Sequence, residues 1–312
     1  MVPARAKLLF TLVALLFLSS FSHIVAQQQN ADTRVFNVSV VDENGKPYVG
    51  LKVENFLVSV DKKPRRIVSL TTENTPVGVG ILLDFSGSLG PSDKKDANAF
   101  RRKLNDAITH FLAVSNSNND YFVGTFNNRV AFSETWTGPV ESIFEKVGAP
   151  ERYGPTALYD ALYHGIEQVM KGRHSRRVIL MVTDGIDNDS KRTFNEVVNL
   201  VKRSDVTIYA LAVYDESTRE SSLTAEGFGV LDDLTKPSGG RSILLKQNAS
   251  AEAVKSAFQI IADNLQSHYQ LLIENEPVAG PEKWRKFTLK LNLPDEKGRP
   301  KLFTWNRPGF YQ

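Results

Sequence analysis

The sequence contains no cysteine among its 312 residues. This absence excludes a disulfide framework, a thiolate metal site, a cysteine nucleophile and a lipid-bearing cysteine behind a signal segment. The chain also has little net charge: the formal value is +3, and it falls to +1 when residues 1–26, with Arg5, Lys7 and no acid, are removed. Phosphate binding needs a concentrated basic surface, and basic runs such as residues 62–66 are short, so nucleic acid is not expected as a partner.

Long hydrophobic runs are missing after the start of the chain, and the one at the start is short. Arg5 and Lys7 precede the apolar run Leu8 to Leu18, and small residues then lead to Ala26. This layout predicts a signal peptide over residues 1–26, cleaved after Ala26. The alternative is a membrane anchor, but the apolar core is too short to span a bilayer comfortably. We therefore expect an exported protein, periplasmic or secreted, with no membrane span after signal removal.

The stretch ILLDFSGSLG, residues 81–90, places an acid and two serines directly after an apolar run. A hydrolase with a serine nucleophile would have Gly-x-Ser-x-Gly here, and the first glycine is missing. Outside the signal segment the four histidines are scattered over segments expected to be helices and loops, and surface or packing roles suit them better than catalysis. They are His110, His164, His174 and His268. We therefore predict that the protein is not an enzyme.

Two β-rich flanks enclose a longer central region. The N-terminal flank, residues 27–75, has strand-like runs at Val35–Val41 and Phe56–Val60, and the C-terminal flank is residues 267–312. Strands of the C-terminal flank are expected at Tyr269–Ile273, Phe287–Leu293 and Leu302–Trp305. Each flank alone is small for a stable sheet, so we expect the two to pair into one β-sandwich; two separate small sheets are the alternative.

The central region, residues 76–266, alternates strand-like and helical patterns. Apolar runs at Val77–Leu83, Tyr121–Phe126, Val178–Val182 and Val206–Val213 predict strands. Helical patterns occupy about Asp93–Val114, Ala157–Met170, Phe194–Lys202 and Ala251–Leu265. This order predicts an α/β fold with a doubly wound, mostly parallel sheet, in which ligands bind at the carboxyl ends of the strands.

Oxygen-bearing side chains gather at these strand ends. Asp84 follows the first strand of the region, with Ser86 and Ser88 behind it, and Asp184 follows the strand Val178–Val182. Thr156 lies in a Gly-Pro turn just before a helix. Neutral hydroxyls and carboxylates are ligands that a hard divalent cation prefers. A polar strand-end turn is the alternative for the first loop alone, but Thr156 and Asp184 favour a metal site.

This constellation resembles the von Willebrand factor type A (vWA) domain and its metal-ion-dependent adhesion site. The family pattern is Asp-x-Ser-x-Ser after the first strand, a Thr in a later Gly-rich turn and an Asp after the fourth strand, and it is matched within about Pro76 to Gln266. The matching residues are Asp84, Ser86, Ser88, Thr156 and Asp184. The resemblance implies that the two serines bind the cation directly, that the threonine binds it directly or through water, and that the aspartates act mostly through water. It implies Mg²⁺, ahead of Mn²⁺ or Ca²⁺.

The function implied by this resemblance is adhesion to a protein partner that presents Asp or Glu to the bound cation. The flanks, with DENGKPYVGL near the start and WNRPGFYQ at the end, resemble those of secreted bacterial VWFA-related proteins. In related adhesion domains the last helix moves when ligand binds, which implies the same for residues 250–265. Asp187 and Asp189 are candidates for a second ion, with a solvated loop as the alternative. Two other functions are an envelope structural component with a structural metal and an accessory subunit of an enzyme complex.

Overall fold

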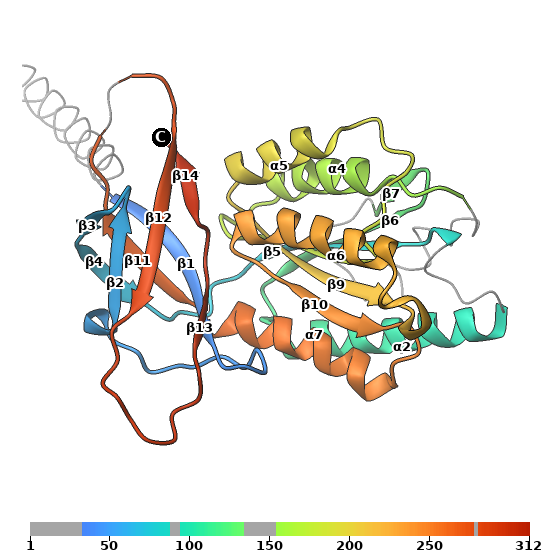
Figure 1. The fold of residues 1–312 in the computed structure, drawn as a ribbon, viewed down its shortest axis with the longest axis horizontal. Helices are drawn as coiled ribbons and strands as arrows, with labels where there is room; N and C mark the ends of the chain where they lie inside the picture. The colour runs from blue at the N-terminus through green and yellow to red at the C-terminus, as the bar shows by residue number, and fades with distance from the viewer. Residues whose placement is uncertain (1–32, 88–93, 134–153, 278–279) are drawn as a thin grey trace, which may run out of the picture.

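The computed structural model describes residues 33–87, 94–133, 154–277 and 280–312. Figure 1 shows two units side by side, an antiparallel β-sandwich and an α/β unit with helices above and below its sheet. The predicted α/β fold class is confirmed, with a central, mostly parallel sheet and additional antiparallel sheets.

The central sheet has six strands in the order β10-β9-β8-β5-β6-β7. Its strands are β5 (Gly78–Asp84), β6 (Asp120–Phe126), β7 (Val130–Phe132), β8 (Arg177–Thr183), β9 (Val206–Tyr214) and β10 (Ser242–Lys246). All neighbours pair in parallel except β6 and β7. Every residue of β5 is buried, because helices cover both faces of the sheet at its centre.

Two layers of helices cover this sheet. On one face lie α2 (Lys94–Val114) and α7 (Ala251–Gln266), whose apolar side chains share a core with alternate strand residues such as Ile81. On the other face lie α4 (Leu158–Met170), α5 (Phe194–Arg203) and α6 (Ser222–Thr235), packed against the intervening residues such as Leu82. Short 3-10 turns are η1 (Val53–Asn55), η3 (Glu216–Thr218) and η4 (Lys236–Ser238).

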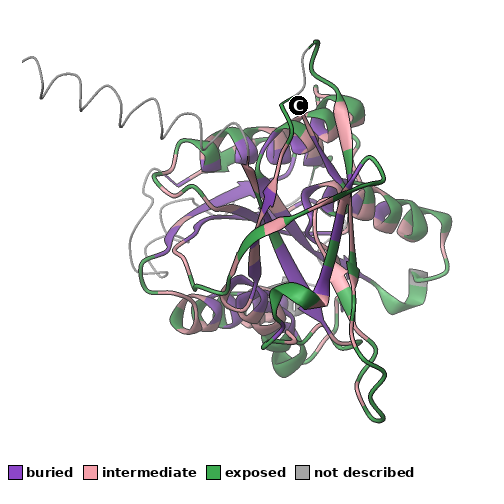
Figure 2. Cartoon of the chain, turned by 90° about the vertical axis from the view of Figure 1, so that its left-hand side faces the viewer, coloured by how far each residue is buried: buried purple, intermediate pink, exposed green. Residues whose placement is uncertain are grey.

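The β-sandwich is built from both ends of the described chain. One sheet has the order β13-β1-β11-β4 and the other β14-β12-β2-β3. The strands are β1 (Thr33–Val41), β2 (Phe56–Val60), β3 (Lys63–Arg65), β4 (Ile67–Thr71), β11 (Tyr269–Glu274), β12 (Trp284–Leu291), β13 (Phe303–Trp305) and β14 (Gly309–Tyr311). Their inward side chains form one core, in which the Phe36 and Phe287 rings stack 3.9 Å apart. Figure 2 shows this unit from its outer side, with buried strand segments behind exposed loops.

The strands with continuous apolar runs lie within two residues of their predicted bounds, and so do the four predicted helices. The prediction omitted β3, β4, β7, β10, β14 and α6. Five of these are strands of three to five residues, all of them at sheet edges, where apolar periodicity is weakest. Leaving out the undescribed stretches, we find no helix between residues 33 and 312 with the length and hydropathy of a membrane span. The predicted signal peptide lies outside the described residues.

Candidate metal centre

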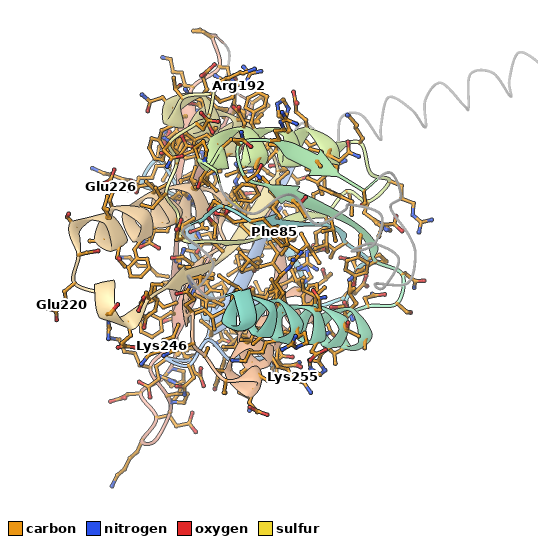
Figure 3. All side chains as sticks on the ribbon, turned by 90° about the vertical axis from the view of Figure 1, so that its right-hand side faces the viewer. Phe85, Arg192, Glu220, Glu226, Lys246 and Lys255 are labelled. Atoms are coloured by element: carbon orange, nitrogen blue, oxygen red, sulfur yellow. The ribbon has the colours of Figure 1, made fainter. Side chains whose placement is uncertain are left out.

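Asp84 is the last residue of β5 and its carboxylate is fixed from two sides. Its Oδ1 accepts a hydrogen bond from the Ser86 backbone N–H at 2.8 Å, and its Oδ2 accepts one from the Thr183 hydroxyl at 2.7 Å. The Ser86 hydroxyl also hydrogen-bonds to it. Both Asp84 and Ser86 are buried. Figure 3 looks onto this end of the sheet, where Phe85, the next residue, lies near the middle of the view.

Asp184 brings a second carboxylate to the same place. It directly follows β8, the neighbour of β5, and the pairing of Leu83 with Val182 sets Asp84 beside Thr183 at the strand ends. Burial, and secondly the negative charge of Asp184, raise the pKa of Asp84 to about 7. The buried Asp84 carboxylate and the half-buried Asp184 carboxylate repel one another, and a cation bound between such groups would relieve that repulsion.

Thr156 is held by the loop that follows Asp184. Its backbone N–H donates to the Asn188 side-chain oxygen at 2.6 Å, and its carbonyl accepts from the N–H groups of Asn188 and Asp189 at 2.9 and 3.0 Å. The residue is 2% exposed. A buried threonine at this place offers a neutral hydroxyl oxygen, which is a ligand type that a hard cation accepts.

The end of β6 ties the other two loops together. The Phe126 carbonyl accepts from the Phe85 N–H at 2.7 Å, and the next carbonyl, that of Asn127, accepts from the Ala157 N–H at 2.7 Å. Backbone hydrogen bonds therefore link the loops of Asp84, Thr156 and Asp184 in a ring at the carboxyl end of the sheet. The donor set is all oxygen, which suits Mg²⁺.

The sequence also named Ser88, Asp187 and Asp189 as candidate ligands. Ser88 lies outside the described residues. Asp187 accepts from the Tyr159 N–H at 3.2 Å and from the Ser190 hydroxyl at 2.5 Å, so its carboxylate interacts with the first turn of α4. Asp189 is exposed. Among the described residues no group of three or more histidine and acidic side chains is arranged around a metal position.

Sequence reasoning missed three groups that shape this centre. The Thr183 side chain holds Asp84, and the Asn188 side chain holds Thr156. For Thr183 a signal was present in the sequence, since it is a polar residue next to Asp184 at the end of a buried strand. The third is a glycine pair: Gly185, with φ +85°, lies against Gly227 of α6. A Cβ atom on Gly227 would collide with the Asp184 carbonyl oxygen, so α6 packs directly on the peptide of Asp184.

Comparison with known proteins gives a family match for the unit that carries the centre. Residues 79–227 match the model of the von Willebrand factor type A domain. Proximal thread matrix protein 1 from the mussel byssus is 14% identical, with a TM-score of 0.47 over 65% of this chain and 49% of its own. The chain thus spans about half the length of that protein.

Two bacterial structures are similar at the same level. A von Willebrand factor type A protein from Catenulispora acidiphila is 13% identical, with a TM-score of 0.46 over 89% of this chain and 74% of its own. The PilB minor pilin from Streptococcus sanguinis is 15% identical, with a TM-score of 0.46 over 61% of each chain. A search of curated proteins found no match.

Proposed function

We propose that this protein is an exported, non-enzymatic binding protein whose von Willebrand factor type A domain, matched at residues 79–227, grips an acidic residue of a protein partner through a divalent cation. Domains of this type typically mediate protein interaction or adhesion, which agrees with such a role. The proposal rests on one observation. The buried Asp84 carboxylate lies close enough to Asp184 for the charge of Asp184 to raise its pKa, at a place where backbone hydrogen bonds join three loops.

The residues of this centre have two kinds of role: some would bind the cation as neutral ligands, and others supply negative charge. Ser86, Thr156 and, by the family resemblance, Ser88 would hold the cation with neutral hydroxyls, while Asp84 and Asp184 supply the negative charge. A cation held in this way would supply an incompletely neutralised charge and an open coordination position for a carboxylate oxygen of the partner. Thr183 keeps Asp84 oriented by donating its hydroxyl hydrogen to Oδ2.

Metal binding is tested by calorimetric titration of Mg²⁺ into EDTA-stripped protein. Wild type is expected to bind one ion, and Asp84→Ala none. Glu226→Gln is the matched control, because it removes an exposed negative charge from α6 at the same end of the sheet. Equal binding by wild type and Asp84→Ala would end the proposal.

Partner binding is tested by a cross-linking pull-down from native envelope, run with and without EDTA. The proposal requires a partner that is lost on chelation while the fold, followed by circular dichroism, survives. A structural metal in an envelope component predicts the reverse, a lower melting temperature under EDTA with no partner lost. An accessory subunit of an enzyme complex predicts that the captured partner carries an activity that this chain lacks.

A further inference from the structure

A cavity of about 330 Å³ lies where the β-sandwich meets the α/β unit. Its walls come from β1 and β11 on one side and, on the other, from the start of β8, the start of β9 and the end of α7. Figure 1 shows this junction to the left of the sheet, whereas the candidate metal centre lies beyond the strand tips at the right. The two places are therefore at opposite ends of the same parallel strands.

The cavity carries an excess of positive charge. Three arginines line it, Arg34, Arg176 and Arg307, and Asp205 is the one acid among its lining residues. Three positive charges against one negative leave a formal charge of +2. Asp205 is already engaged, since its Oδ1 accepts from Arg307 Nη1 at 2.6 Å, and its side chain is 69% exposed at the solvent-facing rim.

Two of these arginines have hydrogen-bond donors to spare. A guanidinium has five N–H donors. Within the described residues, the single side-chain hydrogen bond of Arg176 runs from Nη1 to the Leu265 carbonyl oxygen at 2.7 Å. Arg34 approaches Asp205 only to 3.6 Å and lies over the Phe310 ring at 4.3 Å. An acceptor in the cavity would satisfy donors that the described part of the protein leaves open.

Three buried side-chain nitrogen atoms of residues that line the cavity also lack hydrogen-bond partners among the described residues. His268, which is 1% exposed, has no hydrogen-bond partner on either ring nitrogen among the described residues, and the Nε of Arg307 has none either. Burial, and then the charge of Arg176, lower the pKa of His268 to about 3, so its ring is neutral. The Leu265 backbone raises this pKa and is the smallest of the three effects. Its contact with the ring is too poorly aligned or too long to count as a hydrogen bond. Unpartnered buried polar groups are costly, and a bound ligand offers them partners.

We propose that this interdomain cavity binds a small organic anion, whose carboxylate or phosphate group accepts hydrogen bonds from Arg34 and Arg176. Aromatic walls, with Tyr209 and Trp305 at a ring distance of 6.5 Å, give an apolar part of the ligand a surface to contact. The volume lies at the small end of ordinary ligand sites, which restricts the ligand to a compact molecule. Because the walls belong to both units, a bound anion would join them and stabilise the fold.

The test is a binding titration on the purified full chain in EDTA, so that the metal centre plays no part. Inorganic phosphate, sulfate and benzoate are titrated at constant ionic strength against chloride, with calorimetry and the melting temperature as readouts. We expect saturable binding below about 10 mM and a higher melting temperature with at least one of the three. The phosphate and benzoate arms tell a phosphate ligand from a carboxylate ligand, and saturable binding in either supports the site.

Variants locate the binding. Arg34→Gln is expected to weaken it at least about tenfold, the effect of losing charge-assisted hydrogen bonds. Asp205→Asn is expected to tighten it several-fold, because it removes the negative charge at the rim. Arg66→Gln, an exposed arginine of the same sandwich paired with Glu274, is the control and leaves binding unchanged.

Two results would overturn the proposal. One is that none of the three anions binds more tightly than chloride, and the other is that Arg34→Gln and Asp205→Asn both bind as wild type does. Asp84→Ala is expected to keep anion binding intact. Failure of the metal titration therefore leaves this inference standing, and failure of the anion titration leaves the metal centre standing.

Discussion

Replacing Asp84 with asparagine tests the electrostatics of the candidate metal centre directly. The substitution removes the buried charge and keeps an oxygen that accepts from the Ser86 N–H, while the Thr183 hydroxyl can turn to accept from the new amide. Side-chain size is nearly unchanged. The variant therefore isolates the cost of holding a carboxylate beside Asp184 in the absence of a cation.

The magnitude follows from the pKa of this carboxyl group. Burial and the charge of Asp184 raise the pKa of Asp84 from 3.8 to about 7. Between these values the folded state keeps a proton that the unfolded state has lost, so stability falls as pH rises through this window and is constant above it. At roughly 1.4 kcal/mol per pH unit the full cost is about 4 kcal/mol, and local relaxation reduces it to about 2 to 4 kcal/mol.

Urea unfolding in EDTA, followed by circular dichroism between pH 4.5 and 8, measures this cost. Asp84→Asn should match wild type within about 1 kcal/mol at pH 4.5, where the carboxyl group is neutral, and exceed its stability by about 2 to 4 kcal/mol at pH 8. Glu226→Gln, the exposed control, should show no such trend. Adding Mg²⁺ at about 100 times its Kd should stabilise wild type by about 2.7 kcal/mol and Asp84→Asn far less.

The reasoning fails if Asp84→Asn is no more stable than wild type at pH 8 in EDTA, or if the difference in stability between them does not change with pH. Because asparagine keeps the size and the hydrogen bonds of Asp84, either result would mean that the charge of Asp84 does not destabilise the fold. There would then be no electrostatic reason for a cation to bind at this place.

Three further predictions concern other parts of the fold. In urea unfolding, Gly227→Ala should destabilise the protein by about 1 to 3 kcal/mol, because the added Cβ collides with the Asp184 carbonyl oxygen, and it should also weaken Mg²⁺ binding. Its control is Gly229→Ala, whose added carbon has no atom within 4 Å and which should stabilise α6 by up to about 1 kcal/mol. His268→Phe should reduce the loss of stability as pH falls from 6.5 to about 4, because the unfolded state of wild type gains a proton there that the buried ring, with a pKa of about 3, refuses. Hydrogen exchange over residues 250–270 should change when partner binds in Mg²⁺, and unchanged protection would contradict a moving last helix.

The sequence predicts the central sheet well because burial on both faces leaves a plain signal. The run Val178–Val182 is apolar throughout and Val206–Val213 is apolar except at Thr207, and the strands observed there extend them by no more than a residue at each end. Helix α6 was missed because Gly227 and Gly229 lower its helical propensity. The reason for the first glycine is a contact with Asp184, which lies 43 positions earlier and which no local pattern reveals.

For the candidate centre, the sequence identifies side chains but not what holds them. The spacing of Asp84, Ser86 and Asp184 relative to the strands places them at one end of the sheet. The tether between Thr156 and Asn188 depends on how two loops meet, and strand periodicity carries no information about it. The interdomain cavity was not predicted at all, because its three arginines come from three segments far apart in sequence, and each looks like an ordinary solvated charge.

Helix α7 connects the two ends of the molecule at which we place ligands. It begins at Ala251, at the carboxyl end of the sheet, and its last turn is fastened beside the cavity by Arg176 on the Leu265 carbonyl and by the Asn264 amide on the Gly45 carbonyl at 3.0 Å. Two residues separate its end from β11. A shift of the helix along its axis would therefore have to break these contacts or carry the sandwich with it. An anion bound between Arg34 and Arg176 would reinforce the first of those contacts, so it would oppose any such shift, and by linkage a shifted helix would hold the anion less tightly.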